Sequence, residues 1–431
     1  MKATKNRETS QELAALDELL GGALAGRLSR REMLRRATTL GLSAPVVAAM
    51  LSVAPGAAAQ GTPVVAPSGD PVVLGGAYNL TGGLSSLENP ARDGSELALD
   101  EVNAAGGVLG RPLQLDVEDG KSEPTAVTNA AKKLIEENKV VALIGITDTS
   151  MALPVAGAAQ DASIPFLTVG ATAPVIADTG DYVFLLPFGD NVQAAASAEF
   201  AKEKGWMSCA LLVDDQQDYT KFLAQYFKDA YTASEVGGTI VKELSYAAGD
   251  TDYSAQLTEL KNLNPQPQVI FISSGPAEIG TIVKQARALG IQLPILGGDG
   301  YDTPDLITLA GDAANNVFFT THEGIYGEES SAKAFNEAYQ AKFGKAPQSV
   351  FAALGYDGVK LMVDAIARAG STDGDKIRDA LAATKGYKAV TGTISYDEGS
   401  RVPTKSVALI EVKGGVFTLL DTVTPQNVPA P

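Results

Sequence analysis

The sequence has very little of the chemistry that disulfides and most metal sites need. Its 431 residues include one cysteine, Cys209, and one histidine, His322. A single cysteine excludes an internal disulfide and a cysteine-cluster metal site, and a single histidine excludes a site built from several histidines. Cys209 begins an apolar run, so we expect a small buried side chain rather than a reactive thiol. We therefore expect no metal and no cofactor.

Positive charge is also scarce. The chain has 34 Lys and Arg against 51 Asp and Glu, a formal net charge of −17. A nucleic-acid partner needs a basic face, so we expect none. The 45% hydrophobic and 20% charged shares are those of an ordinary folded protein.

The N-terminus has the pattern of an export signal. Arg30 and Arg31 form a twin-arginine pair, and a weakly apolar stretch follows over 37–53. That stretch is too short and too rich in Ala and Gly to span a membrane. Small residues over 55–59 then suit a signal peptidase. We expect a signal peptide over 1–59, cleaved near Ala59, and a soluble periplasmic or otherwise extracytoplasmic protein.

From Asp70 on, strand-length apolar runs alternate with helical segments of about ten to fifteen residues. This alternation predicts an α/β fold with doubly wound parallel sheets. The pattern restarts at Gly189, which indicates two lobes joined by a multi-strand hinge. We assign 70–188 and 322–390 to lobe 1, 189–321 and 391–424 to lobe 2, and 425–431 to a frayed tail. Three strands with no helix between them end the chain, the last two joined by a turn at 413–415.

The most informative stretch is 140–174. Two apolar strands there end in small, hydroxylated loops, Thr147–Ser150 and Gly170–Thr172. Ligands of open α/β sheets lie beyond the carboxyl ends of strands, and a helix N-terminus attracts anions. One such loop alone indicates only a helix cap. Two adjacent loops favour a site for a small carboxylate in the cleft between the lobes.

Several short motifs, in order along the chain, carry a family resemblance. They are Asn79–Gly82, Glu101–Gly110, 140–174, Gly249–Ser254, Lys284–Gly290, Gly297–Gly300 and Gly355–Asp357. With them the chain resembles the type I periplasmic binding proteins of the branched-chain amino-acid and amide transport class, relatives of the Leu/Ile/Val-binding protein. The resemblance implies a monomeric solute-binding protein that delivers an amino acid, amide or related carboxylate to an ABC permease in the membrane.

The same resemblance implies the contacts of the ligand. An α-carboxylate would lie at Thr149 and Ser150 and in the loop of Ala171 and Thr172. An α-ammonium would lie at the carbonyl of Gly170 and at Asp299, and Tyr219 of the second lobe would help close the pocket. Some relatives have aromatic residues where this chain has Leu87 and Gly275, so we expect a pocket of different size.

Some alternatives stay open at this stage. Asp299 could be a turn aspartate, Tyr219 could simply begin a helix, and Asp148 could cap its helix or face a cationic group. A sensory role that presents the solute to a receptor is a second functional hypothesis. An exported hydrolase is a third, but His322 is the only imidazole and no nucleophile motif is present. We therefore expect no enzyme.

Overall fold

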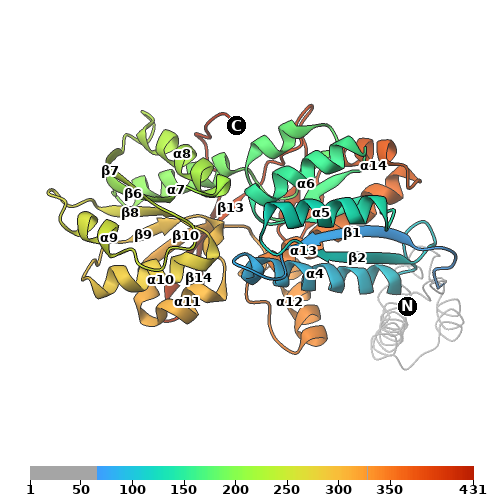
Figure 1. Ribbon diagram of the computed structural model, residues 1–431, viewed down its shortest axis with the longest axis horizontal. Coiled ribbons are helices and arrows are strands. Elements are labelled where there is room, and N and C mark those ends of the chain that lie inside the picture. The colour runs from blue at the N-terminus through green and yellow to red at the C-terminus, as the bar shows by residue number, and fades with distance from the viewer. Residues whose placement is uncertain (1–65, 328) are drawn as a thin grey trace, which may run out of the picture. The chain divides into compact units, whose positions relative to one another are not determined.

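The computed structural model describes residues 66–431 apart from Glu328, and this part of the chain forms one compact unit. The predicted signal peptide, residues 1–59, lies outside the described residues. Two separate sheets organise the unit, as Figure 1 shows. Among the described helices, none combines the length and the apolar character that a membrane crossing requires.

The sheet of the first lobe has five parallel strands. In chain order they are β1 (Val72–Tyr78), β2 (Leu113–Asp119), β3 (Ala142–Gly145), β4 (Phe166–Thr168) and β5 (Val183–Leu185). Their spatial order is β2-β1-β3-β4-β5, with Leu74 beside Ala142 and Leu143 beside Phe166. Because both faces of β1, β3, β4 and β5 are covered, their residues are mostly apolar without alternation, whereas the edge strand β2 alternates apolar and polar residues.

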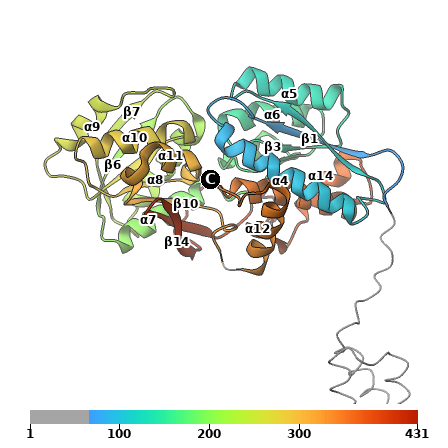
Figure 2. The ribbon, with the colours of Figure 1, turned by 90° about the horizontal axis from the view of Figure 1, so that it is seen from below.

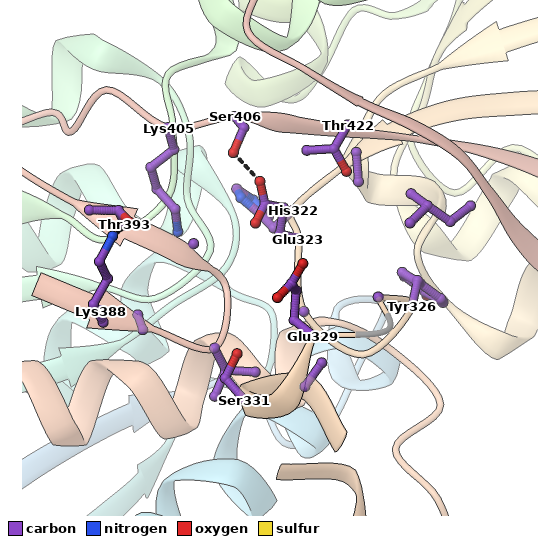
Figure 3. A pocket seen from close by; sticks show the side chains of 18 of the residues that line it. His322, Glu323, Tyr326, Glu329, Ser331, Lys388, Thr393, Lys405, Ser406 and Thr422 are labelled. Atoms are coloured by element: carbon purple, nitrogen blue, oxygen red, sulfur yellow. Dashed lines mark hydrogen bonds between the residues drawn. The ribbon is translucent and has the colours of Figure 1, made fainter. Parts of the chain in front are cut away.

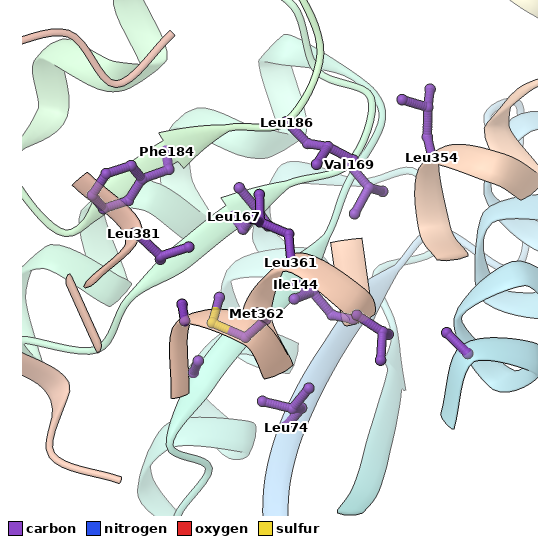
Figure 4. Packing of buried hydrophobic residues seen from close by; sticks show 14 of the residues in the cluster. Leu74, Ile144, Leu167, Val169, Phe184, Leu186, Leu354, Leu361, Met362 and Leu381 are labelled. Carbon is purple, nitrogen blue, oxygen red and sulfur yellow. The ribbon is translucent and has the colours of Figure 1, made fainter. Parts of the chain in front are cut away.

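Helices cover both faces of this sheet. On one face lie α4 (Ser85–Ala104), α13 (Phe351–Ala369) and α14 (Gly374–Ala382), and on the other α5 (Pro124–Glu136) and α6 (Thr149–Asp161). Figure 2 shows α5 and α6 across β1 and β3 from α4. Figure 4 shows the packing of Leu361 and Met362 of α13 against Ile144 and Leu167 of the sheet. A further helix, α12 (Ser330–Phe343), packs beside α4.

The second sheet is mixed. Its strands are β6 (Ser208–Asp214), β7 (Thr239–Tyr246), β8 (Val269–Ser273), β9 (Ile295–Gly297), β10 (Val317–Thr321), β13 (Val407–Lys413) and β14 (Val416–Val423). The order is β14-β13-β10-β9-β8-β6-β7. The pairs β10–β13 and β13–β14 are antiparallel, and the other neighbouring pairs are parallel. Gly414 and Gly415 join these two strands with positive φ angles, as a two-residue hairpin requires.

The helices of the second lobe also lie on two faces. One face carries α7 (Asp190–Glu203) and α8 (Asp218–Thr232), and the other carries α9 (Ser254–Lys261), α10 (Pro276–Ala288) and α11 (Pro304–Ala310). Short helices η1 (Pro174–Thr179), η2 (Asp299–Tyr301) and η3 (Gly311–Ala314) complete the fold. Three chain segments pass between the lobes, after β5, after β10 and before β13.

The predicted lobe boundary at residue 391 is wrong. A small hairpin, β11 (Tyr387–Ala389) and β12 (Gly392–Ile394), crosses it, and Ile394 and Tyr396 are buried in the core of the first lobe. The Tyr396 hydroxyl donates to the Leu185 carbonyl oxygen at 2.8 Å. Because a short strand without a helix before it gives no indication of its partner sheet, the sequence pattern placed this segment in the wrong lobe.

The composition predicted a frayed tail over residues 425–431, but in the structure the tail is bound to the second lobe. The backbone N–H groups of Gln426 and Asn427 donate to Glu199 Oε1 of α7 at 2.9 and 3.1 Å. Asn191 Nδ2 donates to the Pro429 carbonyl oxygen at 2.9 Å. These contacts tie residues 426–429 to the second lobe.

Candidate functional site

The loop between β3 and α6 brings the first lobe's polar groups to the sheet edge. Gly145 turns the chain with φ +126°, and a Cβ there would lie 1.9 Å from the Ala77 carbonyl oxygen, so only glycine fits. Asp148 is the N-cap of α6, and its Oδ1 accepts from the Met151 N–H at 3.2 Å. Asp148 also lines the cavity between the lobes. Asp148 therefore caps its helix and also borders the cavity.

Glu88 of α4 supports this loop, and sequence reasoning missed it. Its carboxylate accepts from the backbone and side-chain N–H groups of Asn79 and from the backbone N–H and hydroxyl of Thr147. Complete burial raises the pKa of Glu88, and the hydrogen bonds from Asn79 and Thr147 reduce this rise. Glu88 lies in the first turn of α4, ahead of Pro90, where the sequence gives no strand-end motif that would mark it.

In the second lobe, Asp299 follows β9 and is 2% exposed. Its Oδ1 accepts from the Tyr219 hydroxyl at 2.8 Å and from Gln193 Nε2 at 3.0 Å. The Tyr219 hydroxyl oxygen also accepts from the Gly300 N–H at 3.0 Å. Asp299 is therefore oriented by other side chains, and Tyr219 does more than begin α8.

A small cavity lies between the two lobes. Its walls are Leu84, Leu87, Thr147, Asp148 and Phe351 of the first lobe and Tyr219, Gly275, Pro276, Asp299 and Gly300 of the second. Its volume is about 10 Å³, the room of roughly one water molecule. Beside it, the Asp218 N–H donates to Ser150 Oγ at 2.9 Å across the cleft. A solute of amino-acid size therefore needs the lobes to separate before it enters.

Of the nine predicted ligand contacts, the structure brings four to this cavity: Leu87, Tyr219, Gly275 and Asp299. The other five do not line it. The Thr149 and Thr172 hydroxyls are buried and have no hydrogen-bond partner among the described residues. Ser150 bonds to Asp218, as above. Leu84, Pro276 and Phe351 line the cavity and were missed, because they are apolar residues that no strand-end motif distinguishes.

Two predicted backbone contacts, Gly170 and Ala171, lie behind the cavity wall. A Cβ on Gly170 would lie 2.6 Å from the Phe351 ring, so glycine is needed for this packing. The Ala171 carbonyl oxygen accepts from the Thr168 hydroxyl at 3.1 Å. That oxygen is therefore already engaged within its own loop.

Burial perturbs the acids and the histidine around the site. Burial raises the pKa of Asp148 to about 7 and that of Asp190 to about 8. Gln193 Nε2 donates to Asp190 Oδ1 at 2.9 Å, so one amide joins Asp190 and Asp299. Burial lowers the pKa of His322 to about 4. Its ring stacks on Phe188 with centroids 3.8 Å apart, and its Nε2 lies 3.5 Å from Asp299 Oδ2.

These shifts predict that the ligand-free protein loses stability as pH rises from 6.5 to 8. Asp148 and Asp190 hold protons in the folded state that the unfolded chain has already lost, so their contribution disappears as pH passes their raised pKa values. His322, whose unfolded form titrates near pH 6.5, and Lys405, with its pKa lowered to about 8, act in the opposite direction, each at one edge of this window, and offset only part of the loss. We expect a loss on the order of 1–2 kcal/mol, measured as a falling Tm.

The matched control for this prediction is Asp190→Asn, which keeps the shape of the side chain. The variant should flatten the decline of Tm across the window. A Tm that is constant or rises between pH 6.5 and 8 in the unmodified protein would show that these two acids are ionised in the folded state.

A larger cavity, about 620 Å³, lies among the segments that join the lobes. Figure 3 shows Lys405, Glu323 and Ser406 pointing into it, with the Ser406 hydroxyl donating to Glu323 Oε1. Lys405 Nζ donates to the Thr391 hydroxyl at 2.9 Å, and burial lowers the Lys405 pKa to about 8. This hinge cavity is lined mostly by the crossing segments, the β11–β12 hairpin and β14, and only its residues 322–327 follow a parallel strand, β10. We therefore take the inter-lobe cavity as the candidate solute site.

Comparisons with known proteins agree with this geometry. A sequence model described as periplasmic binding protein matches residues 71–416. The Leu-, Ile-, Val-, Thr- and Ala-binding protein of Pseudomonas aeruginosa is 26% identical over 76% of this chain and 86% of that protein. The leucine-binding protein LivK of Thermotoga maritima is 35% identical, with TM-score 0.77 over 82% of this chain and 99% of that one. LivJ of Streptococcus pneumoniae, solved with isoleucine, is 31% identical, with TM-score 0.76 over 81% of this chain and 99% of that one. The chain is a solute-binding protein and belongs to the periplasmic binding protein family.

Proposed function

We propose that this protein captures a small ammonium-bearing solute, an amino acid or related amide, and delivers it to an ABC permease. The observation that carries the proposal is Asp299, a buried carboxylate oriented toward the inter-lobe cavity by Tyr219 and Gln193. The names of the relatives support it, since they describe binders of leucine, isoleucine, valine, threonine and alanine.

In this proposal the two lobes hold opposite ends of the solute. Asp299, with the carbonyl of Gly170, receives the ammonium group when the lobes separate and close again. The unpartnered hydroxyls of Thr149 and Thr172 donate to oxygen atoms at the other end. Charge-assisted bonds of about 1.5–3 kcal/mol each can together exceed an association cost of about 4–15 kcal/mol. Micromolar affinity follows from such a balance.

We also propose how the protein reaches its place of action. The twin-arginine leader over residues 1–59 would export the folded chain, with cleavage near Ala59, and the mature protein would act as an extracytoplasmic monomer. We propose no catalytic role for His322, because its ring is fully buried and stacked on Phe188.

The test is a thermal-shift screen of the purified mature protein with amino acids, their amides and aromatic acids. A bound solute stabilises the folded state by RT ln(1 + [L]/Kd), about 2.7 kcal/mol at a hundredfold excess over Kd. We expect at least one ammonium-bearing compound to raise the Tm by several degrees. If no compound of any class raises it, the solute-binding proposal for this cleft fails.

A further inference from the structure

The charges around the inter-lobe cavity are of one sign. Asp148 lines it from the first lobe and Asp299 from the second, and no Lys or Arg is among the residues that line it. Two more buried acids stand behind them. Glu88 bonds to Thr147 of the wall, and Asp190 shares the amide of Gln193 with Asp299. Closing the lobes therefore confines several carboxylates in a space with little water.

None of the residues that line the cavity is a cation that could pair with these acids. Asp190 is fully buried, and burial raises its pKa to about 8, so it holds its proton at physiological pH. The nearest candidate cation is His322, but burial lowers its pKa to about 4, so it is neutral at physiological pH. Asp299 therefore has no positive partner in the cavity wall, and an ammonium or amidinium group of the ligand would supply one.

The N-terminus of α6 already carries a carboxylate. Asp148 places its own carboxylate there and accepts from the Met151 N–H. The Ser150 hydroxyl oxygen accepts from the Asp218 N–H, which leaves its O–H free to donate. The hydroxyl donors of Thr149, Ser150 and Thr172 suit a neutral oxygen as well as a charged one.

We propose that the cleft selects a small organic cation over the corresponding free acid, with N–H donors of the ligand facing Asp148 and its ammonium or amidinium facing the acids around Asp299. The proposal rests on the solute-binding function above and narrows its ligand class. An N–H group at Asp148 forms a charge-assisted hydrogen bond, whereas a ligand carboxylate at the same place is repelled by the ionised form of Asp148.

The experiment compares matched pairs at pH 7.5 by calorimetry and thermal shift. L-valinamide is compared with L-valine, and benzamidine with benzoate, because each pair differs in the group that would meet Asp148. In the unmodified protein we expect the cationic member of at least one pair to bind about tenfold or more tightly than its acid.

The decisive variant is Asp148→Asn. Asparagine caps a helix about as well as aspartate, so α6 is preserved while the charge is removed. The preference for the cationic member should fall by about tenfold or reverse in this variant. The control is Asp373→Asn, the same change at the exposed N-cap of α14, where the carboxylate accepts from Lys376 N–H at 3.2 Å. It should leave the preference unchanged.

The failures are distinguishable. If an acid binds more tightly than its cationic partner, or if Asp148→Asn leaves their ratio unchanged, the cation proposal is overturned while solute binding stands. It is likewise overturned if the wider screen finds only carboxylate ligands. If nothing in that screen raises the Tm, the solute-binding function itself is wrong.

Discussion

Asp299→Asn is expected to raise the Kd for an ammonium-bearing solute by about two to three decades or more. The ligand's positive charge would then be buried without its closest counter-charge, and such losses cost about 3–5 kcal/mol. The substitution is otherwise gentle. Asparagine keeps an oxygen to accept from Tyr219 and Gln193, and its amide can donate to the neutral His322 Nε2, which lies 3.5 Å from the present Oδ2.

Calorimetric titration with a ligand found in the screen measures this effect. The ligand-free variant should melt at or above the temperature of the unmodified protein. The charge of Asp299 is one of the causes that raise the pKa of Asp190, and the substitution removes this repulsion between two buried acids. Asp312→Asn, which removes the same charge from an exposed position in the same lobe, is the control and should bind normally. An unchanged Kd for Asp299→Asn would remove Asp299 from the site.

The fold was largely predictable because its signals are local. Apolar strands such as Val269–Ser273 are buried on both faces, and this leaves a continuous hydrophobic run in the sequence. The start of α4 is harder to place from sequence, because Pro90 lies inside the helix and proline usually marks a helix boundary. Residues 392–401 were misplaced because their packing partner, the edge of β5, is distant in sequence.

The candidate site was less predictable because it depends on contacts between lobes. The strand-end rule indicated Tyr219 and Asp299, which follow β6 and β9 and line the cavity. It could not indicate that Asp148 would cap α6 and still reach the cavity, or that Ser150 would bond across the cleft to Asp218. It also could not find Glu88 or Gln193, since each acts through hydrogen bonds to residues far along the chain.

The second large effect concerns the packing of α4 against α13. Gly94 lies where these helices touch, and a Cβ there would be 1.8 Å from the Ala352 carbonyl oxygen. Gly355 of α13 is in the reciprocal position, where an added Cβ would lie 1.9 Å from the Ala91 carbonyl oxygen. Backbone atoms cannot move aside as a side chain can, so Gly94→Ala has to push the helices apart. We expect a loss of about 3 kcal/mol, which corresponds to a fall in Tm of about 4 °C for a folded unit of this length.

Chemical denaturation of Gly94→Ala and of Gly157→Ala separates this packing effect from helix propensity. Gly157 lies in α6, and a Cβ there would meet nothing within 4 Å, so alanine should leave stability unchanged or raise it by about 0.5–1 kcal/mol. Because α4 also carries Leu87 and Glu88 to the solute site, its displacement by Gly94→Ala should weaken ligand binding as well. If Gly94→Ala is as stable as Gly157→Ala, the two helices do not approach as closely as described, and the placement of Glu88 behind the cavity wall loses its support.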